Sequence, residues 1–383
     1  MSKGKLLLID GHSILSRAFY GMPMLTNSEG KHLNAVYGFL TIMFKVIDDE
    51  EADHFAVAFD VSRKTFRNDI YADYKGTRKP MPEELHEQVP LIQEVLSAMN
   101  IPILTMEGYE ADDILGTVAK KSQSDSVEVT ILSGDRDLLQ LADEHIKISI
   151  PKTSKGRTEV YNYYPDDVKN EWGVSPLEFI DVKALMGDTS DNIPGVPSIG
   201  EKTAKAIIAE YGSIENAMAH VSELKPPRAA KALMEHYDMA EMSKVLATIN
   251  INVPISFSFD DAEISDMYND KALELMKKFE FKSLVPRFQK NGVSTTNEYR
   301  PENLKVVTDP YLADVVFKDA LEYSSVGFKI IPEDSGNTNE ARAPKAIALS
   351  LCNDRNYVLV CSERLGPDML KEGIYRIFKG SEE

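Results

Sequence analysis

Three short apolar runs in the first 140 residues each end at an aspartate. The runs KLLLID, HFAVAFD and VEVTILSGD finish at Asp10, Asp60 and Asp135. Short apolar runs rich in β-branched residues are typical of strands that a parallel sheet buries on both faces. Stretches suited to helices, such as GFLTIMFKVIDDE and LIQEVLSAM, lie between them. This alternation predicts an α/β fold with a mostly parallel central sheet flanked by helices.

Further acidic residues accompany these strand ends. Asp137 follows Asp135 after one residue, and the segments YEADDILG and GDTSDNIPG each carry acids at positions i and i+3. The carboxyl ends of parallel strands lie at one edge of the sheet, where sites form in such folds, so the strand-end acids are expected to gather there. The candidate metal ligands are Asp10, Asp60, Glu110, Asp112, Asp113, Asp135, Asp137, Asp188 and Asp191.

Each acidic group also has a simpler interpretation. Acids in a first helical turn are commonly caps, and GDRD is a common turn sequence. These interpretations do not explain why so many acidic groups are expected at one edge of the sheet, because gathered carboxylates repel one another unless cations are present. Oxygen-only ligands favour two Mg²⁺ or Mn²⁺ ions over zinc. Two such ions about 4 Å apart can activate a water and stabilise the leaving oxygen of a phosphodiester.

A long basic segment at 63–90 interrupts the strand–helix pattern. Loops of this length in a compact domain are usually functional, and basic residues interleaved with aromatic ones grip single-stranded nucleic acid. The alternative is a solvated run of charges. We expect Lys75 and Arg78 to stabilise charge on the scissile phosphate. The segment carries Arg63, Lys64, Phe66, Arg67, Tyr71, Tyr74, Lys75, Arg78 and Lys79.

The chain from 166 to 290 is mainly helical in pattern, and its stretch GVPSIGEKTA resembles a helix–hairpin–helix element. Gly195 and Gly200 would let the backbone approach a phosphate, which the amides of the following helix would bind. Lys202 would add a positive charge. In isolation such a lysine is an ordinary surface residue, but the stretch begins four residues after Asp191.

The rest of the pattern predicts the domain organisation. Residues 1–165 are expected to form the sheet domain and residues 166–290 the helical region. Residues 291–303 are polar and suit a linker. Strand-like runs return in 304–383, which predicts a second α/β module.

Composition changes this picture little. The 383 residues are 43% hydrophobic and 27% charged, and no apolar run approaches the roughly 18 residues of a membrane span. The two cysteines, Cys352 and Cys361, imply neither a disulfide framework nor a zinc site and fit a reducing cytoplasm. The formal net charge of -18 argues against nucleic acid, unless the acids are clustered to hold cations.

Six motifs together resemble the 5′-nuclease (5′–3′ exonuclease) domain of bacterial DNA polymerase I, in the flap endonuclease superfamily. They are LLLIDGHSILSRAFYGMP, VAFD, YKGTRKPMP, YEADDILG, LSGDRDLLQL and GDTSDNIPGVPSIGEKTA, and they cover residues 1 to about 290. The resemblance implies a PIN-like sheet domain whose nine acids hold two ions. It also implies that 63–90 is a helical arch threaded by a free 5′ strand.

The resemblance assigns DNA contacts as well. Arg17, Tyr71, Lys75 and Arg78 match substrate-contacting positions, and Lys79 is grouped with them. The hairpin at 195–204 matches a duplex-binding element that also holds a K⁺ ion. The implied function is structure-selective 5′–3′ exonuclease and flap endonuclease activity in DNA replication and repair. The implied partners are DNA with a 5′ flap, nick or 5′ end, or an RNA–DNA hybrid, bound by a monomer.

The module at 304–383 resembles the start of a 3′–5′ exonuclease-like domain. Its first such strand, SSVGFKIIPED, lacks the D-x-E carboxylates of an active version, so we expect no proofreading. The module is expected to be partial, and no polymerase segment is recognisable in the chain.

Two other functions stay open. A PIN-type ribonuclease would share the acidic sheet edge, although such domains usually lack the hairpin and the long arch. A non-catalytic DNA-binding module would use the hairpin alone and would not need the acids.

Overall fold

The computed structural model describes residues 4–62, 64–154, 157–291, 304–323, 326–332, 344–352 and 355–380. Its contacts divide the chain into two compact units, Met1–Val293 and Ser294–Glu383. The expected linker at 291–303 lies outside the described residues from 292 onward, and so does Arg63.

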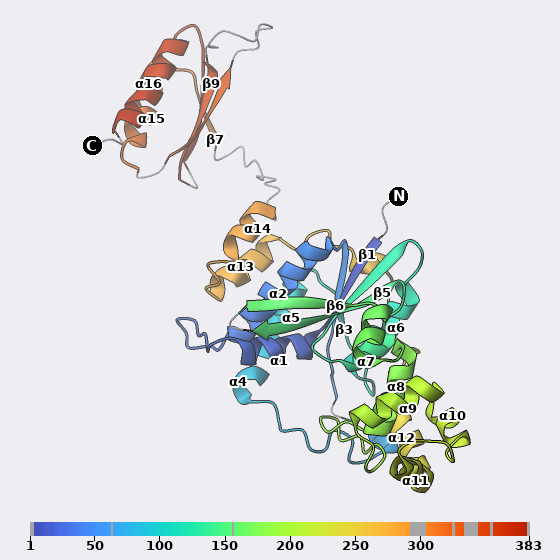
Figure 1. Cartoon of the computed structure of the whole chain (residues 1–383). Helices are drawn as coiled ribbons and strands as arrows, with labels where there is room; N and C mark the ends of the chain where they lie inside the picture. The colour runs from blue at the N-terminus through green and yellow to red at the C-terminus, as the bar shows by residue number, and fades with distance from the viewer. Residues whose placement is uncertain are drawn as a thin grey trace. The chain divides into compact units, whose positions relative to one another are not determined.

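The first unit is built on a six-stranded sheet with the order β3-β2-β1-β4-β5-β6 (Figure 1). All neighbouring strands pair in parallel except β5 and β6, which form an antiparallel hairpin. The predicted α/β fold with a mostly parallel central sheet is therefore confirmed. The strands are β1 (Gly4–Asp10), β2 (His54–Ala58), β3 (Ile103–Leu104), β4 (Val127–Leu132), β5 (Ile146–Ser154) and β6 (Arg157–Tyr163).

The continuous apolar sequence of β1 fills two cores at once. Successive strand residues point to opposite faces, so Leu6 and Leu8 enter one buried cluster while Leu7 and Ile9 enter the other. The second cluster includes residues of α2, α5, α13 and α14. The helices that frame the sheet are α1 (Gly11–Gly21), α2 (Asn34–Glu50), α5 (Gln88–Ala98), α6 (Ala111–Ser122), α13 (Asp270–Lys278) and α14 (Val285–Asn291).

The helical region of the first unit shares the other core with the sheet. Val182, Ile207 and Leu233 are buried in the same cluster as Leu6 and Ile114, so this region packs directly on the sheet domain. A short 3₁₀ helix, η2 (Asp260–Ala262), follows it. The helices of the region are α7 (Pro165–Trp172), α8 (Pro176–Met186), α9 (Glu201–Tyr211), α10 (Ile214–Ala219), α11 (Pro227–Glu235) and α12 (Tyr237–Ala247).

The segment expected to form a helical arch is only partly helical. It contains α3 (Phe66–Ile70) and α4 (Glu83–His86), and residues 71–82 between them are turns and irregular backbone. Gly76, Pro80 and Pro82 account for the interruption, because glycine and proline both disfavour helix interiors.

The strand after residue 126 ends earlier than its sequence pattern indicates. β4 stops at Leu132, so Asp135 lies in a turn and Asp137 begins the 3₁₀ helix η1 (Asp137–Leu141). Side chains close this turn, since the Asp135 amide donates to Ser133 Oγ at 3.0 Å and the Asp137 amide donates to Asp135 Oδ1 at 2.9 Å. Such local bonds compete with strand continuation.

The second unit has a four-stranded sheet with the order β7-β10-β9-β8. Only the β7–β10 pair is parallel. Val316, Phe317, Ile347 and Leu359 form its core with neighbouring residues. The elements are β7 (Leu304–Val307), α15 (Pro310–Ala320), β8 (Gly327–Pro332), β9 (Pro344–Cys352), β10 (Arg355–Val360) and α16 (Pro367–Gly380). Among the described residues of both units, no helix has the length and apolarity needed to cross a membrane.

Two glycines form the tightest backbone contact of the hairpin between α8 and α9. Gly195 has φ +63°, and a Cβ at this position would lie 2.4 Å from the Gly187 nitrogen. The Gly195 amide donates to the Ser243 hydroxyl of α12 at 3.1 Å. The hairpin is therefore fixed by a backbone approach that a side chain would prevent.

We predict that Gly195→Ala lowers the free energy of unfolding by about 2 kcal/mol or more, because it combines backbone strain with overlap. Gly200→Ala is the matched control, since Gly200 has φ -93° and no atom lies within 4 Å of its Cβ position. Its effect should stay within about 1 kcal/mol, the cost of placing alanine at the N-cap of α9. Chemical denaturation of both variants measures the difference, and equal stabilities would contradict the packing role of Gly195.

Candidate active site

Asp10 anchors the acidic edge of the first sheet. It is the last residue of β1 and caps α1, with the Ser13 amide donating to Oδ1 at 3.0 Å. Ser133 Oγ, just beyond β4, donates to Oδ2 at 2.8 Å. Burial raises the pKa of Asp10 to about 6 against the lowering effect of these bonds, and Asp60 and Asp135 add repulsion.

Asp60 and Asp112 extend this edge from neighbouring elements. Asp60 accepts the Ala111 amide at the start of α6 at 2.8 Å, and its Oδ2 lies 3.4 Å from His12 Nδ1. Burial would raise the pKa of Asp60, but the bonds from His12 and Ala111 outweigh it and hold this pKa below its usual value. Burial, with Asp135 and Asp10 adding repulsion, raises the pKa of Asp112 well above its usual value.

A second group joins η1 to the loop after α8. Lys183 Nζ lies 2.8 Å from Asp137 Oδ1 and also contacts Asp188 Oδ2. Burial and the neighbouring Asp135 raise the pKa of Asp137 to about 7. The pKa of Asp188 falls to about 2, because bonds from Lys183 and Ser190 outweigh its burial.

A third group joins the start of α6 to the base of the 63–90 segment. Lys75 Nζ lies 2.9 Å from Glu110 Oε1 and 3.7 Å from Asp191 Oδ2. The Tyr74 hydroxyl donates to Glu110 at 3.1 Å and to Asp191 at 3.2 Å, and Arg78 pairs with Asp191 Oδ1. The structure thus brings both predicted catalytic cations to two predicted ligands.

Lys75 holds an uncommon backbone conformation at this contact. Its φ is +55°, a region that costs free energy for a residue with a side chain. The Lys75 amide donates to the Asp191 carbonyl at 2.8 Å, and Asn192 Nδ2 donates to the Asp73 carbonyl at 2.7 Å. These bonds compensate the strain and direct Lys75 toward the carboxylates.

Asp113 is paired with a buried arginine, which does not fit the expectation that it is a metal ligand. Its side chain is fully buried and receives both Arg67 guanidinium nitrogens, each at 2.8 Å. The Glu110 and Asn250 amides also donate to it, at 3.1 and 2.8 Å. With both oxygens occupied by four donors, Asp113 is a structural anchor.

The predicted DNA contacts lie in different settings. Arg17 of α1 is half-buried beside Gly134, and its Nε has no hydrogen-bond partner among the described residues. Burial lowers its pKa. Tyr71 is partly buried against the cluster of Tyr74, Ile193, Leu246 and Ala247. Lys79 is exposed.

The hairpin also departs from expectation at one residue. Gly195 was expected to face a phosphate, but it is buried, contacts Gly187 and directs its amide to Ser243. Gly200 is exposed and caps α9, where the first amides of the helix have no intrahelical acceptor. Lys202 is exposed on the same first turn.

Sequence reasoning missed the roles of four side chains, namely Arg67, Tyr74, Ser133 and Lys183. Arg67 and Tyr74 were noted only as members of the basic segment. A signal existed for Ser133, since a hydroxyl directly before GD can close a turn. Lys183 carried no signal, because a lysine within PLEFIDVKALM is indistinguishable from a surface lysine.

The donor set of this edge is oxygen-only. Within the described residues, no three His, Cys, Asp or Glu side chains already form a group that could hold a metal ion, and Lys75 and Lys183 lie among the acids instead. Burial is the main reason that the pKa values of Asp10, Asp112 and Asp137 are raised, and repulsion from neighbouring carboxylates raises them further. This chemistry fits Mg²⁺ or Mn²⁺.

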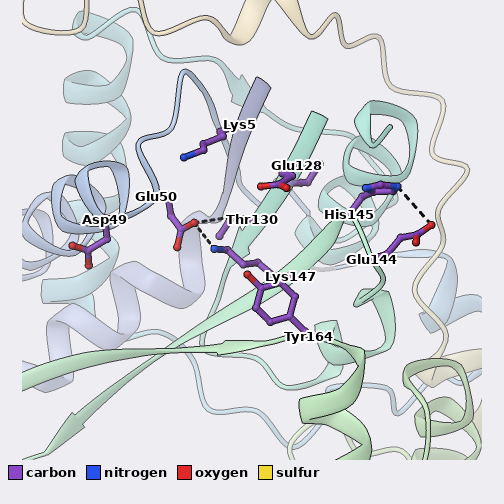
Figure 2. A pocket seen from close by; sticks show the side chains of 10 residues that line it. Lys5, Asp49, Glu50, Glu128, Thr130, Glu144, His145, Lys147 and Tyr164 are labelled. Atoms are coloured by element: carbon purple, nitrogen blue, oxygen red, sulfur yellow. Dashed lines mark hydrogen bonds and ion pairs between the residues drawn. The ribbon is translucent and has the colours of Figure 1, made fainter. Parts of the chain in front are cut away.

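A separate cavity of about 200 Å³ lies away from these acids (Figure 2). It is lined by Lys5 and Val129 near the amino ends of β1 and β4. Glu50 pairs with Lys147 there, and Glu144 lies 3.6 Å from His145 Nε2. The cavity therefore contains internally paired charges and none of the predicted site residues.

Comparison with protein-family models decides what kind of protein this is. Residues 5–173 match the N-terminal resolvase-like domain of 5′-3′ exonucleases, and residues 174–270 match their C-terminal SAM fold. The chain belongs to the 5′–3′ exonuclease family. The first model covers the sheet and α7, and the second covers the helical region with the hairpin.

Similar curated proteins are longer than this chain. DNA polymerase I of Bacillus caldotenax is 44% identical over 287 residues, which is 75% of this chain and 32% of that protein. DNA polymerase I of Bacillus subtilis is 39% identical over 357 residues, which is 90% of this chain and 40% of that protein. The chain thus spans about a third to two-fifths of the length of these relatives.

Solved structures show the same exonuclease fold at low identity. Bacteriophage T5 5′-exonuclease with bound divalent zinc ions has a TM-score of 0.52 at 20% identity, covering 75% of this chain and 97% of that one. The T5 flap endonuclease in a pseudo-enzyme–product complex with DNA and metal ions has a TM-score of 0.53 at 19% identity, with the same coverage. The PIN-like 5′-nuclease architecture is confirmed by this likeness.

Two neighbouring aspartates of α6 should respond oppositely to neutralisation. Because the folded pKa of Asp112 is raised, its ionisation favours unfolding as pH rises above about 4. Asp112→Asn should therefore stabilise the metal-free protein at pH 7, and the gain should vanish below about pH 4. Asp113→Asn should cost about 3–5 kcal/mol, since it leaves Arg67 buried without its partner. Denaturation in the presence of a chelator across this pH range tests both, and a destabilising Asp112→Asn would contradict the assignment.

Proposed function

We propose that the chain is a divalent-metal-dependent, structure-selective 5′–3′ exonuclease and 5′-flap endonuclease that hydrolyses DNA phosphodiesters. The observation that carries the proposal is the gathering of repelling carboxylates, with raised pKa values at Asp10, Asp112 and Asp137, at one sheet edge. Membership of the 5′–3′ exonuclease family supports it. The T5 relatives were solved with metal ions and DNA, which accords with it.

The acids would divide into two ligand groups. One Mg²⁺ or Mn²⁺ ion would be bound by Asp10, Asp60, Glu110, Asp112 and Asp135. The second ion would be bound by Asp137, Asp188 and Asp191. Bound there, two such ions would activate a water and stabilise the leaving oxygen. Asp113 is left out, because Arg67 and two backbone amides occupy it.

Lys75 and Arg78 would act on the scissile phosphate from the base of the 63–90 segment. Lys75 pairs with Glu110 and Arg78 pairs with Asp191, so both cations point at the acidic edge. A phosphate entering there would accept these donors and have its developing charge stabilised. Tyr74, bonded to the same two acids, would keep them in place.

The remaining contacts would position the DNA. The first amides of α9 and Lys202 would bind the duplex backbone, which reads shape and not sequence. A K⁺ ion at the hairpin would assist. The Arg17 guanidinium, whose Nε has no hydrogen-bond partner in the described part of the chain, would meet a phosphate near Asp135. The free 5′ strand would thread through the 63–90 segment. Cleavage would leave a 5′-phosphate on the product.

Two features favour this function over a PIN-type ribonuclease or a non-catalytic DNA-binding module. The hairpin and the 63–90 segment are both present, and the second contacts the acidic edge through Lys75.

For residues 304–383 we propose a 3′–5′ exonuclease-like module without proofreading, since β8 carries no carboxylate.

Asp135→Ala should abolish Mg²⁺-dependent cleavage of a labelled 5′-flap substrate while leaving duplex binding in Ca²⁺ largely intact. The physical reason is that Asp135 lies amid the acids, whereas the duplex contacts lie on α9. Cleavage assays on flap, nicked and single-stranded substrates, with and without Mg²⁺, measure the first effect. Full activity of this variant would refute the mechanism.

Lys202→Ala should weaken DNA binding about equally for all sequences. Losing one phosphate contact should also reduce the slope of log affinity against log salt by about 1. Salt titrations with two duplexes of unrelated sequence give both quantities. Lys231→Ala, which removes an exposed lysine paired with Glu235 on α11, is the matched control. A loss confined to one sequence would contradict backbone recognition.

A further inference from the structure

Lys183 is a buried lysine inside the acidic edge. It lies on α8, is 7% exposed and extends its ammonium group between two carboxylates from separate segments. Lys183 Nζ lies 2.8 Å from Asp137 Oδ1 in η1, and it also contacts Asp188 Oδ2 in the loop after α8. Both belong to the ligand group proposed for the second ion.

Burying an ammonium group is costly unless partners surround it. A packing role alone would be met more cheaply by an apolar side chain of similar length. The position of Lys183 therefore needs an electrostatic explanation, which the adjacent carboxylates provide. Without a positive charge here, Asp137 and Asp188 would repel each other and Asp135.

One ammonium group does not neutralise this group of acids. Asp135, Asp137 and Asp188 carry three potential negative charges against the single ammonium group of Lys183. The site can accept more positive charge, but any cation that binds Asp137 and Asp188 has to compete with Lys183. Lys183 should therefore weaken cation binding at this position.

We propose that Lys183 is a positioning residue that acts as an internal counterion, holding Asp137 and Asp188 in place and setting the affinity for the second divalent ion. This inference rests on the proposed function. An ammonium group displaced from the two aspartates could pair with a substrate phosphate. Ion binding and DNA binding would then favour each other, since such coupling is reciprocal.

The test is calorimetric titration of DNA-free protein with Ca²⁺, comparing wild type with Lys183→Gln. We expect the weaker binding event to tighten roughly tenfold or more in the variant, because a unit charge next to the site has been removed. Lys183→Arg keeps the charge and should retain the weak affinity of wild type. An affinity in Lys183→Gln that is unchanged or weaker overturns the proposal.

Lys244→Gln is the matched control for the loss of a two-carboxylate lysine bridge. Lys244 lies 2.7 Å from Asp181 and 2.8 Å from Glu215, neither of which belongs to the acidic edge. This variant should keep the Ca²⁺ affinity of wild type. An equal tightening in Lys244→Gln would show that any lost lysine has this effect, and would overturn the specific role of Lys183.

A second measurement covers a variant that does not fold. If Lys183→Gln is unfolded without metal, Ca²⁺ should restore its far-ultraviolet circular dichroism by replacing the missing charge, and failure to do so overturns the proposal. A different result would overturn the proposed function: a wild-type protein that neither binds Ca²⁺ nor cleaves flap DNA. That result would also overturn the inference about Lys183. Wild-type binding and cleavage with an unaltered variant affinity overturns the inference alone.

Discussion

Repulsion between carboxylates at one sheet edge is the constraint on which the rest of the structure depends. Parallel strands bring Asp10, Asp60 and Asp135 to the same edge, and burial makes the charge of Asp10 more costly. Cations from outside the sheet partly compensate: Lys183 serves Asp137 and Asp188, while Lys75 serves Glu110 and Asp191. The helical region and the basic segment are thus tied to the sheet by ion pairs with the acids of this edge.

A second, fully buried ion pair keeps these parts in register. Arg67, at the base of the basic segment, donates to Asp113 at the start of α6 and to the carbonyls of Leu246 and Thr248 at the C-terminal end of α12. One side chain therefore joins three segments that are distant in sequence. Because Asp113 also fixes the Glu110 amide, the position of this active-site acid depends on Arg67.

The sequence predicted what depends on local pattern. The continuous apolar run of β1 correctly indicated burial on both faces, and the strand-end acids do lie at one edge. The prediction from sequence failed where the role of a residue depends on contacts with residues distant in the chain. Asp113 and Asp112 are adjacent in sequence, and donors distant from both, Arg67 and the Asn250 amide, distinguish the structural anchor from the candidate ligand. The orientation of the Gly195 amide is fixed by its hydrogen bond to Ser243, 48 residues away. The role of Lys183 has no local sequence pattern that could predict it.

The net charge shows why a global quantity can mislead about a site. A formal charge of -18 argues against DNA binding when it is spread evenly, since phosphates are repelled. Here part of it is concentrated where lysines already compensate and where divalent ions would compensate further, so the local field at the edge can reverse sign. The exposed amides of α9 and Lys202 lie outside that edge. An acidic protein can therefore offer phosphates a favourable path, provided that its acids are sequestered around cations.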